Sequence, residues 1–210
     1  MKLAPHHRLA LAGAVLTSAI ALTDAVTHGL TGGWSPFSEE SEATTMVVVG
    51  CLVHGLTYAA LALVLVREAP AFAATNRIAR ATRWVLLPSL VTLALGFLTA
   101  VPAMTAYHVT SGVVYDVSGL VATFAFLGLI LGALVLGLAA LRTRALGTGG
   151  QVLALMLPVL GVTVLLQVLA PLWAHPAYLE TTLQLGLALV GVGATAPATT
   201  GRSVLPSQVG

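Results

Sequence analysis

The sequence predicts an all-α membrane protein, a polytopic bundle of six transmembrane helices with both termini in the cytoplasm. Of its 210 residues, 58% are hydrophobic and only 8% are charged, and the mean hydropathy is +0.98. A soluble domain carries about 25% charged residues. Six apolar runs of about 20 residues each, joined by short loops, account for residues 1–196 as one transmembrane domain. That length leaves no room for a separate soluble domain.

The first apolar run predicts a span over residues 9–29. It carries Asp24 and His28, which lie four residues apart and therefore on one helix face. The basic head before it and the small residues 19–21 also fit a cleavable signal peptide. We favour a retained span, because the apolar run continues through Val26.

The second span is expected over residues 44–66, and its middle carries Cys51, His54 and Tyr58 at intervals of about one turn. This spacing places the three side chains on one helix face. An ionisable side chain is costly in lipid, so a histidine in the middle of a span indicates a functional site.

Two loops of opposite charge flank this span. The loop before it is acidic, with Glu39, Glu40 and Glu42, and is interpreted as a solvated turn. After it, Arg77, Arg80 and Arg83 recur every three residues. This pattern predicts a short helix on the membrane surface whose arginines contact lipid phosphates.

Four further runs complete the bundle. The expected spans cover residues 84–106, 113–141, 151–173 and 178–196, and the polar tail 197–210 is expected to be disordered. The fourth run carries Gly128 and Gly132, a spacing that lets helix backbones approach closely. We expect these glycines to serve helix packing, and a homo- or hetero-oligomer through them is an open alternative.

The distribution of cations sets the orientation. The loops between spans 1 and 2, 3 and 4, and 5 and 6 contain no Lys or Arg. All nine lie in the head, the other two loops and the tail: Lys2, Arg8, Arg67, Arg77, Arg80, Arg83, Arg142, Arg144 and Arg202. The positive-inside rule then places both termini in the cytoplasm.

With this orientation, the polar residues of the spans gather in the outer half of the membrane. Asp24 is expected ~8 Å and His54 ~13 Å below the outer boundary, from the rise of a helix. We therefore expect these two side chains to face the bundle interior and to pair with each other. The candidate binding residues are Asp24, His28, Cys51, His54, Tyr58, Asp116, Gln167, Glu180 and Gln184.

Three interpretations of this polar layer stay open. It could be the outward-facing site of a small transporter or binding protein, in which an Asp–His pair takes up and releases a proton. It could only fix helix packing in a structural or accessory membrane subunit. It could also belong to an intramembrane enzyme or a metal- or haem-binding protein. The sequence contains no H-E-x-x-H, G-x-S-x-G or Walker motif, so we favour a non-enzymatic role without a cofactor.

The composition indicates which partners and which cellular location to expect. The net charge of +2 gives no indication of a nucleic-acid partner, and Cys51 as the single cysteine excludes an intrachain disulfide. The expected partners are the lipid bilayer, anionic lipids at the cytoplasmic face, and a small molecule or a proton. Arginine outnumbers lysine eight to one, and Ala, Leu, Val and Gly dominate. This composition favours a bacterial protein of the cytoplasmic membrane.

Overall fold

The computed structural model describes residues 3–38, 41–141 and 145–194, and within these ranges the chain forms helices and no strands. Five helical segments are long and apolar enough to cross a membrane, in agreement with a helical membrane protein. They are α1 (Pro5–Thr31), α2 (Thr44–Arg67), α4 with η1 and α5 (Arg77–Ala106), α6 (Val113–Ala140), and α7 with α8 (Gly147–Leu169).

Helix α1 begins earlier than the sequence analysis expects. Pro5 occupies its first turn, where the missing N–H costs nothing, so His6 and His7 belong to the helix and not to a preceding head. The helix ends at Gly32, which adopts a left-handed conformation with φ of 69° and donates its N–H to the carbonyl of His28. Helix α1 therefore carries histidines at both of its ends, with His6 and His7 in its first turn and His28 in its last.

Prolines interrupt two of the long segments. Helix α4 (Arg77–Leu95) passes through a π-helical turn, η1 (Gly96–Ala100), into α5 (Val101–Ala106). Pro102 lacks an N–H and crowds the preceding turn, which explains the widened turn before it. Likewise, the expected span 151–173 is divided into α7 (Gly147–Ala154) and α8 (Met156–Leu169), with Pro158 in the first turn of α8.

The expected sixth span, 178–196, is a much shorter helix. Helix α9 covers Ala177–Ala188, about 18 Å by helix rise. Turns follow it as far as residue 193, and residues 195–210, including the tail, lie outside the described residues. Within the described residues, five and not six helical segments are long and apolar enough to span a membrane. Helix α9 instead lies in the middle of the bundle, in contact with α1, α2, α6, α7 and α8.

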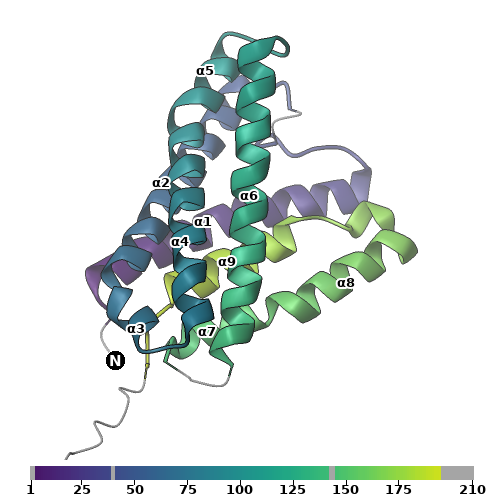
Figure 1. Cartoon of the computed structure of the whole chain (residues 1–210). Helices are drawn as coiled ribbons and strands as arrows, with labels where there is room; N and C mark the ends of the chain where they lie inside the picture. Colours follow the sequence, from purple (N-terminus) through teal and green to yellow (C-terminus); the bar gives the residue numbers. More distant parts are fainter. Residues whose placement is uncertain (1–2, 39–40, 142–144, 195–210) are drawn as a thin grey trace, which may run out of the picture.

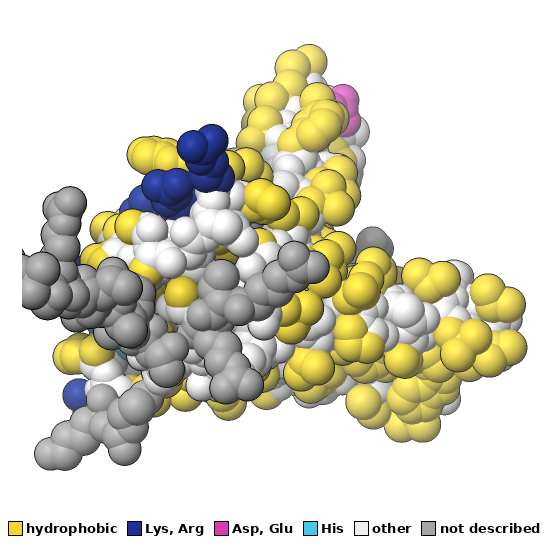
Figure 2. All heavy atoms as spheres, turned by 60° about the horizontal axis from the view of Figure 1, so that its bottom comes forward, with side chains coloured by type: hydrophobic (Ala, Val, Ile, Leu, Met, Phe, Trp, Pro, Cys, Tyr) yellow, Lys and Arg dark blue, Asp and Glu magenta, His cyan; other side chains and the backbone are white. Residues whose placement is uncertain are grey.

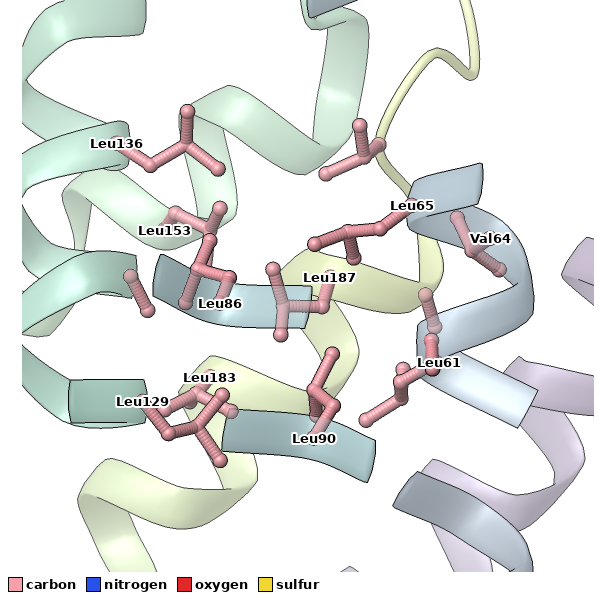
Figure 3. Packing of buried hydrophobic residues seen from close by; sticks show 14 of the residues in the cluster. Leu61, Val64, Leu65, Leu86, Leu90, Leu129, Leu136, Leu153, Leu183 and Leu187 are labelled. Atoms are coloured by element: carbon pink, nitrogen blue, oxygen red, sulfur yellow. The ribbon is translucent and has the colours of Figure 1, made fainter. Parts of the chain in front are cut away.

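Leucines from five helices form the core around α9 (Figure 3). Leu183 and Leu187 of α9 are almost completely buried. They lie among the side chains of α2, α4, α6 and α7: Leu61, Leu65, Leu86, Leu90, Leu129, Leu136 and Leu153. Helix α9 is thus a central packing element, which explains why its polar residues meet those of several helices.

Two parts of the molecule stand away from this core. Figure 1 shows the first half of α6 and the whole of α8 diverging from each other. Residues 113–124 of α6 are exposed except Ser118, and Met156 is the single buried residue of α8. Figure 2 shows both arms covered by hydrophobic side chains. In a membrane, such surfaces face lipid.

Gly128 and Gly132 pack inside the chain. A Cβ at Gly128 would lie 2.7 Å from Ser89 Oγ, and one at Gly132 would lie 2.8 Å from Leu86 Cδ2. Both glycines therefore allow the close approach of α6 to α4. Helix α4 already covers this face, so an oligomer through these glycines would have to displace it.

The start of α1 and the ends of α2 and α9 meet at one end of the bundle. His7 Nδ1 lies 2.9 Å from the Ala188 carbonyl, and His6 Nε2 lies 3.0 Å from Glu68 Oε1. The start of α7 joins them, because Gly191 N donates to Leu146 O at 3.0 Å. We call this the cation-rich end, because α2, α3 (Ala69–Ala73) and α4 place Arg67, Arg77, Arg80 and Arg83 there. Figure 2 shows basic side chains gathered on this face.

Candidate functional site

A cavity lies at the opposite end of the bundle. Its volume is about 330 Å³, near the lower limit for small-molecule sites. It forms where the end of α1, the start of α2, η1 and the start of α9 converge. Polar and aromatic side chains mix in its wall, which contains Asp24, Trp34, Phe37, Ser38, Cys51, His54, Phe97, His175 and Glu180.

Asp24 holds together the two loops beside the cavity. Its Oδ1 accepts the backbone N–H of the buried Ser35 at 2.9 Å, and its Oδ2 lies 3.4 Å from His175 Nε2. His175 Nδ1 in turn accepts the N–H of Ala177 at 3.2 Å, at the start of α9. A neutral His175 therefore carries its proton on Nε2 and donates it to Asp24. The Asp24–His175 pair is satisfied without an additional proton.

His175 lies in the turn between η2 (Pro171–Trp173) and α9, outside the long helices. Burial lowers the pKa of its imidazole, because desolvation disfavours the charged ring, and His28 lowers it further. The Asp24 carboxylate opposes this by stabilising the imidazolium. The net lowering favours a neutral His175.

His54 and Glu180 form a second pair, with a longer separation. His54 Nε2 lies 3.7 Å from Glu180 Oε1, and His54 Nδ1 lies 2.8 Å from the carbonyl of Gly50. A carbonyl only accepts, so Nδ1 carries a proton. In a neutral ring, Nε2 would then direct its lone pair towards the carboxylate. The separation of 3.7 Å is longer than a hydrogen bond, so the place between the two side chains suits a small cation.

Donors from α2 and α9 fix the carboxylate of Glu180. The Tyr58 hydroxyl and the Gln184 side-chain amide each donate to Glu180 Oε1 at 2.8 Å. Both residues are buried, and Thr17 of α1 donates to the Gln184 carbonyl oxygen. The Glu180 carboxylate is therefore held by a network that reaches three helices. Such a network fixes its position at the floor of the cavity.

The rim of the cavity is aromatic. The rings of His28 and Trp34 stack with centroids 4.5 Å apart, and His28 lies 6.3 Å from His175. Phe97 of η1 stacks against His54 with centroids 5.7 Å apart. Aromatic rings and two carboxylates thus lie together in the wall of the cavity, a combination that suits a small cation.

The structure pairs Asp24 and His54 differently from the sequence expectation. Both line the cavity, but Asp24 pairs with His175 and His54 pairs with Glu180. The physical reason is that the turn before α9 and the first residues of α9 pack against both α1 and α2: His175 of the turn pairs with Asp24, and Glu180 of α9 pairs with His54. Helix rise gives the spacing of residues along one helix, but it does not predict the rotation of that helix or which other helix packs against it.

Other candidate residues separate into two groups. His28, Cys51, Tyr58, Glu180 and Gln184 lie in or beside the cavity. Asp116 is exposed near the start of α6 and Gln167 is exposed on α8, so neither joins the site. Both residues belong to the two arms that leave the core, which hydropathy does not predict.

The sequence analysis did not assign Trp34, Phe37 and Phe97 to the site. Trp34 and Phe37 follow Gly32 and Gly33, which predict a turn, and Phe97 lies in an apolar run that predicts a span. The signal in the sequence was the layer of polar residues in the outer half of the spans. An aromatic side chain expected at the same depth as these residues is a candidate for the cavity wall.

Arg77, Arg80 and Arg83 do not form the separate short surface helix that the sequence predicted, because they lie in the first two turns of the long helix α4, at the end of the bundle opposite the cavity. Arg77 and Arg80 are exposed, whereas Arg83 Nε donates to the carbonyl of Leu65 at 2.9 Å near the end of α2. The Arg83 guanidinium also lies 5.8 Å from the Trp84 ring centroid. Arg83 therefore stabilises the contact between α2 and α4 as well as contributing charge.

No family model, curated protein or solved structure matches this chain.

Proposed function

We propose that this chain is a small multi-pass membrane protein that binds a small organic cation in the cavity and couples binding to proton release. The observation that carries the proposal is the His54–Glu180 pair in the cavity wall, whose facing atoms are 3.7 Å apart and leave Glu180 Oε1 open to a cation from the cavity. A bound ammonium group would supply the positive charge beside Oε1 and would displace a proton shared by the pair. Proton-coupled binding of this kind is what a small transporter needs.

The remaining wall fits the same ligand class. Asp24 and Glu180 contribute two carboxylates, and Trp34, Phe37 and Phe97 contribute aromatic faces. Aromatic faces attract ammonium groups, and this attraction is stronger where water is excluded. A cavity of about 330 Å³ restricts the ligand to a small molecule.

The proposal includes the topology. We infer six crossings with both termini in the cytoplasm, in which the short α9 and its following turns make the last crossing. In support, the end of α9 meets the starts of α1 and α7 at the cation-rich end, which the positive-inside rule assigns to the cytoplasm. The cavity then opens outward, and the arginines Arg77 and Arg80 face anionic lipid. A bacterial cytoplasmic membrane is the proposed location.

Ligand-induced stabilisation of the purified protein in detergent tests the binding. Small primary, tertiary and quaternary amines should raise the melting temperature, whereas neutral molecules of the same shape should not. Glu180→Gln should remove the effect. Asp116→Asn is the matched control, because Asp116 is exposed on α6 and away from the cavity, and this variant should behave like the wild type.

A proton assay separates the proposed function from a purely structural role. In weakly buffered solution, addition of a stabilising amine should release protons from the wild type and not from His54→Gln. Proteoliposomes with an internal pH-sensitive dye then report whether binding leads to exchange across the membrane. If no amine stabilises the protein while Glu180→Gln lowers its melting temperature, the polar layer serves helix packing alone.

A further inference from the structure

A second cluster of ionisable side chains lies at the cation-rich end, far from the cavity. His6 Nε2 lies 3.0 Å and His7 Nε2 lies 3.2 Å from the same oxygen, Glu68 Oε1. The three donor atoms lie within 4.8 Å of one another, and the rest of the described chain offers no comparable group of three His, Cys, Asp or Glu side chains. His7 and Asp24 are 17 residues apart on α1, about 25 Å by helix rise.

The local sequence explains why these side chains meet. Pro5 starts α1, so both histidines lie in its first turn, and Glu68 follows directly after the end of α2. Gly191 provides the space for the carboxylate. Its φ is +85°, and a Cβ at this position would overlap Glu68 Oε2. The chain thus brings three separate segments to one point.

The hydrogen bond of His7 determines which ring nitrogen is available as a ligand. His7 Nδ1 lies 2.9 Å from the carbonyl oxygen of Ala188, so Nδ1 carries a proton. In the neutral ring, the lone pair on Nε2 then faces the Glu68 carboxylate. Histidine ligands of metals show this arrangement, with one nitrogen anchored on a carbonyl and the other on the metal. The His7 side chain is only 6% exposed, so water does not separate the two groups.

The distances agree with a shared metal ion. Zn²⁺ binds His nitrogen and carboxylate oxygen at about 2.0–2.2 Å, which in a tetrahedron separates two ligand atoms by roughly 3.4 Å. The two observed separations from Glu68 Oε1 are 3.0 and 3.2 Å. These two separations need to widen by only a few tenths of an ångström to admit the ion, and the third, between the two histidine nitrogens, is within 4.8 Å. His2Glu is also a ligand set that zinc uses with an open fourth position.

We propose that His6, His7 and Glu68 bind one first-row divalent cation, with Zn²⁺ the best match. The ion replaces the proton that the His7–Glu68 contact otherwise requires. It ties the start of α1 to the end of α2 directly and to the end of α9 through the His7–Ala188 hydrogen bond. Water completes the coordination. This site is independent of the proposed cation cavity, because none of its residues lines that cavity.

Metal titration of the purified chain tests this site. The protein must carry no polyhistidine tag, and chelator treatment followed by dialysis removes adventitious metal. Calorimetry with Zn²⁺ should show one saturable site per chain, and Zn²⁺ should raise the melting temperature. Co²⁺ should give the visible absorption of a four-coordinate ion. Glu68→Gln and His7→Gln should weaken Zn²⁺ binding by at least about tenfold.

Two further variants keep the test decisive. His6→Gln changes a partly exposed ligand, so it should fold even if the buried His7 does not tolerate substitution, and it should also weaken binding. His108→Gln is the matched control, because His108 is exposed in the loop after α5, and its affinity should equal that of the wild type. Absence of saturable Zn²⁺ binding, or equal affinity in wild type, Glu68→Gln and His6→Gln, would overturn the proposal.

Discussion

The Tyr58 hydroxyl donates to Glu180 Oε1 at 2.8 Å, which joins the middle of α2 to the first turns of α9 across 122 residues of sequence. Tyr58 is 1% exposed, so no water replaces this bond. The contact fixes the carboxylate that also faces His54. A structural bond and the candidate site therefore share one oxygen atom.

Removal of this hydroxyl should destabilise the protein. Tyr58→Phe keeps the ring and deletes the donor, so we expect a loss of about 1 kcal/mol in the free energy of unfolding, the usual size for one hydrogen bond. Equilibrium unfolding in mixed detergent micelles measures it. Tyr107→Phe is the control, because Tyr107 is 80% exposed and should give no change. Equal stabilities of the two variants would contradict the role of Tyr58.

The close approach of α6 and α7 predicts a second effect. A Cβ at Gly137 would lie 2.5 Å from the Leu153 carbonyl carbon, a backbone atom that has little freedom to move. Gly137→Ala should therefore destabilise the protein by about 1–3 kcal/mol through overpacking. Gly119→Ala on the same helix meets nothing within 4 Å and should be neutral or slightly stabilising, because Ala favours helix. The same unfolding experiment compares them.

Cysteine labelling tests the proposed orientation. In a Cys51→Ala background, cysteines at Ser38 and Thr110 should react with a membrane-impermeant reagent added to intact cells. A cysteine at Thr75, beside the arginines of the cation-rich end, should react only after the membrane is opened. The reverse pattern would invert the topology and place the cavity on the cytoplasmic side.

The lowered pKa of His175 predicts an acid sensitivity. Because burial lowers the pKa of His175 in the folded state, the unfolded chain binds more protons as the pH falls below about 6.5. The contribution of His175 to the free energy of unfolding is therefore fully present above that pH and is lost as the pH falls. His175→Asn should therefore show a shallower decrease in unfolding free energy between about pH 7 and pH 5. His108→Asn, an exposed control, should keep the wild-type slope.

Hydropathy and charge were sufficient to predict the helical membrane architecture, because lipid imposes length and composition on each helix. The expected span 44–66 and the observed helix Thr44–Arg67 have nearly the same bounds, since an arginine ends the apolar run. The predicted bounds were wrong for the last helix, which ends at Ala188 and not at residue 196. Turn-forming glycines at 191 and 193 interrupt an apolar run that hydropathy alone reads as continuous.

The candidate site was only partly predictable, for a geometric reason. Sequence spacing predicts the positions of His54 and Asp24 along their helices, but their partners depend on which other helix packs against both α1 and α2. That helix is α9, and central packing through Leu183 and Leu187 holds it there. The cluster of His6, His7 and Glu68 was missed because Glu68 is distant in sequence from the two adjacent histidines, which were assigned to a basic head.

The last prediction concerns the coupling between His54 and Glu180. Their side chains are 15% and 16% exposed, so removing one partner leaves the other poorly compensated. His54→Leu alone removes the imidazole that faces the Glu180 carboxylate, and Glu180→Gln alone removes the carboxylate that faces His54. Each single variant should therefore be less stable than the wild type.

The double variant His54→Leu/Glu180→Gln removes both members of the pair. Its loss of stability should be smaller than the sum of the two single losses by about 1 kcal/mol, which is typical of coupled neighbours. Equilibrium unfolding of all four proteins at one pH gives this coupling energy. The pair His54→Leu with Asp116→Asn provides the control, because Asp116 lies on an arm outside the cavity and should add independently. Additive losses for His54 and Glu180 would show that the two side chains do not interact, and the carboxylate would then have to be neutralised by a group other than His54.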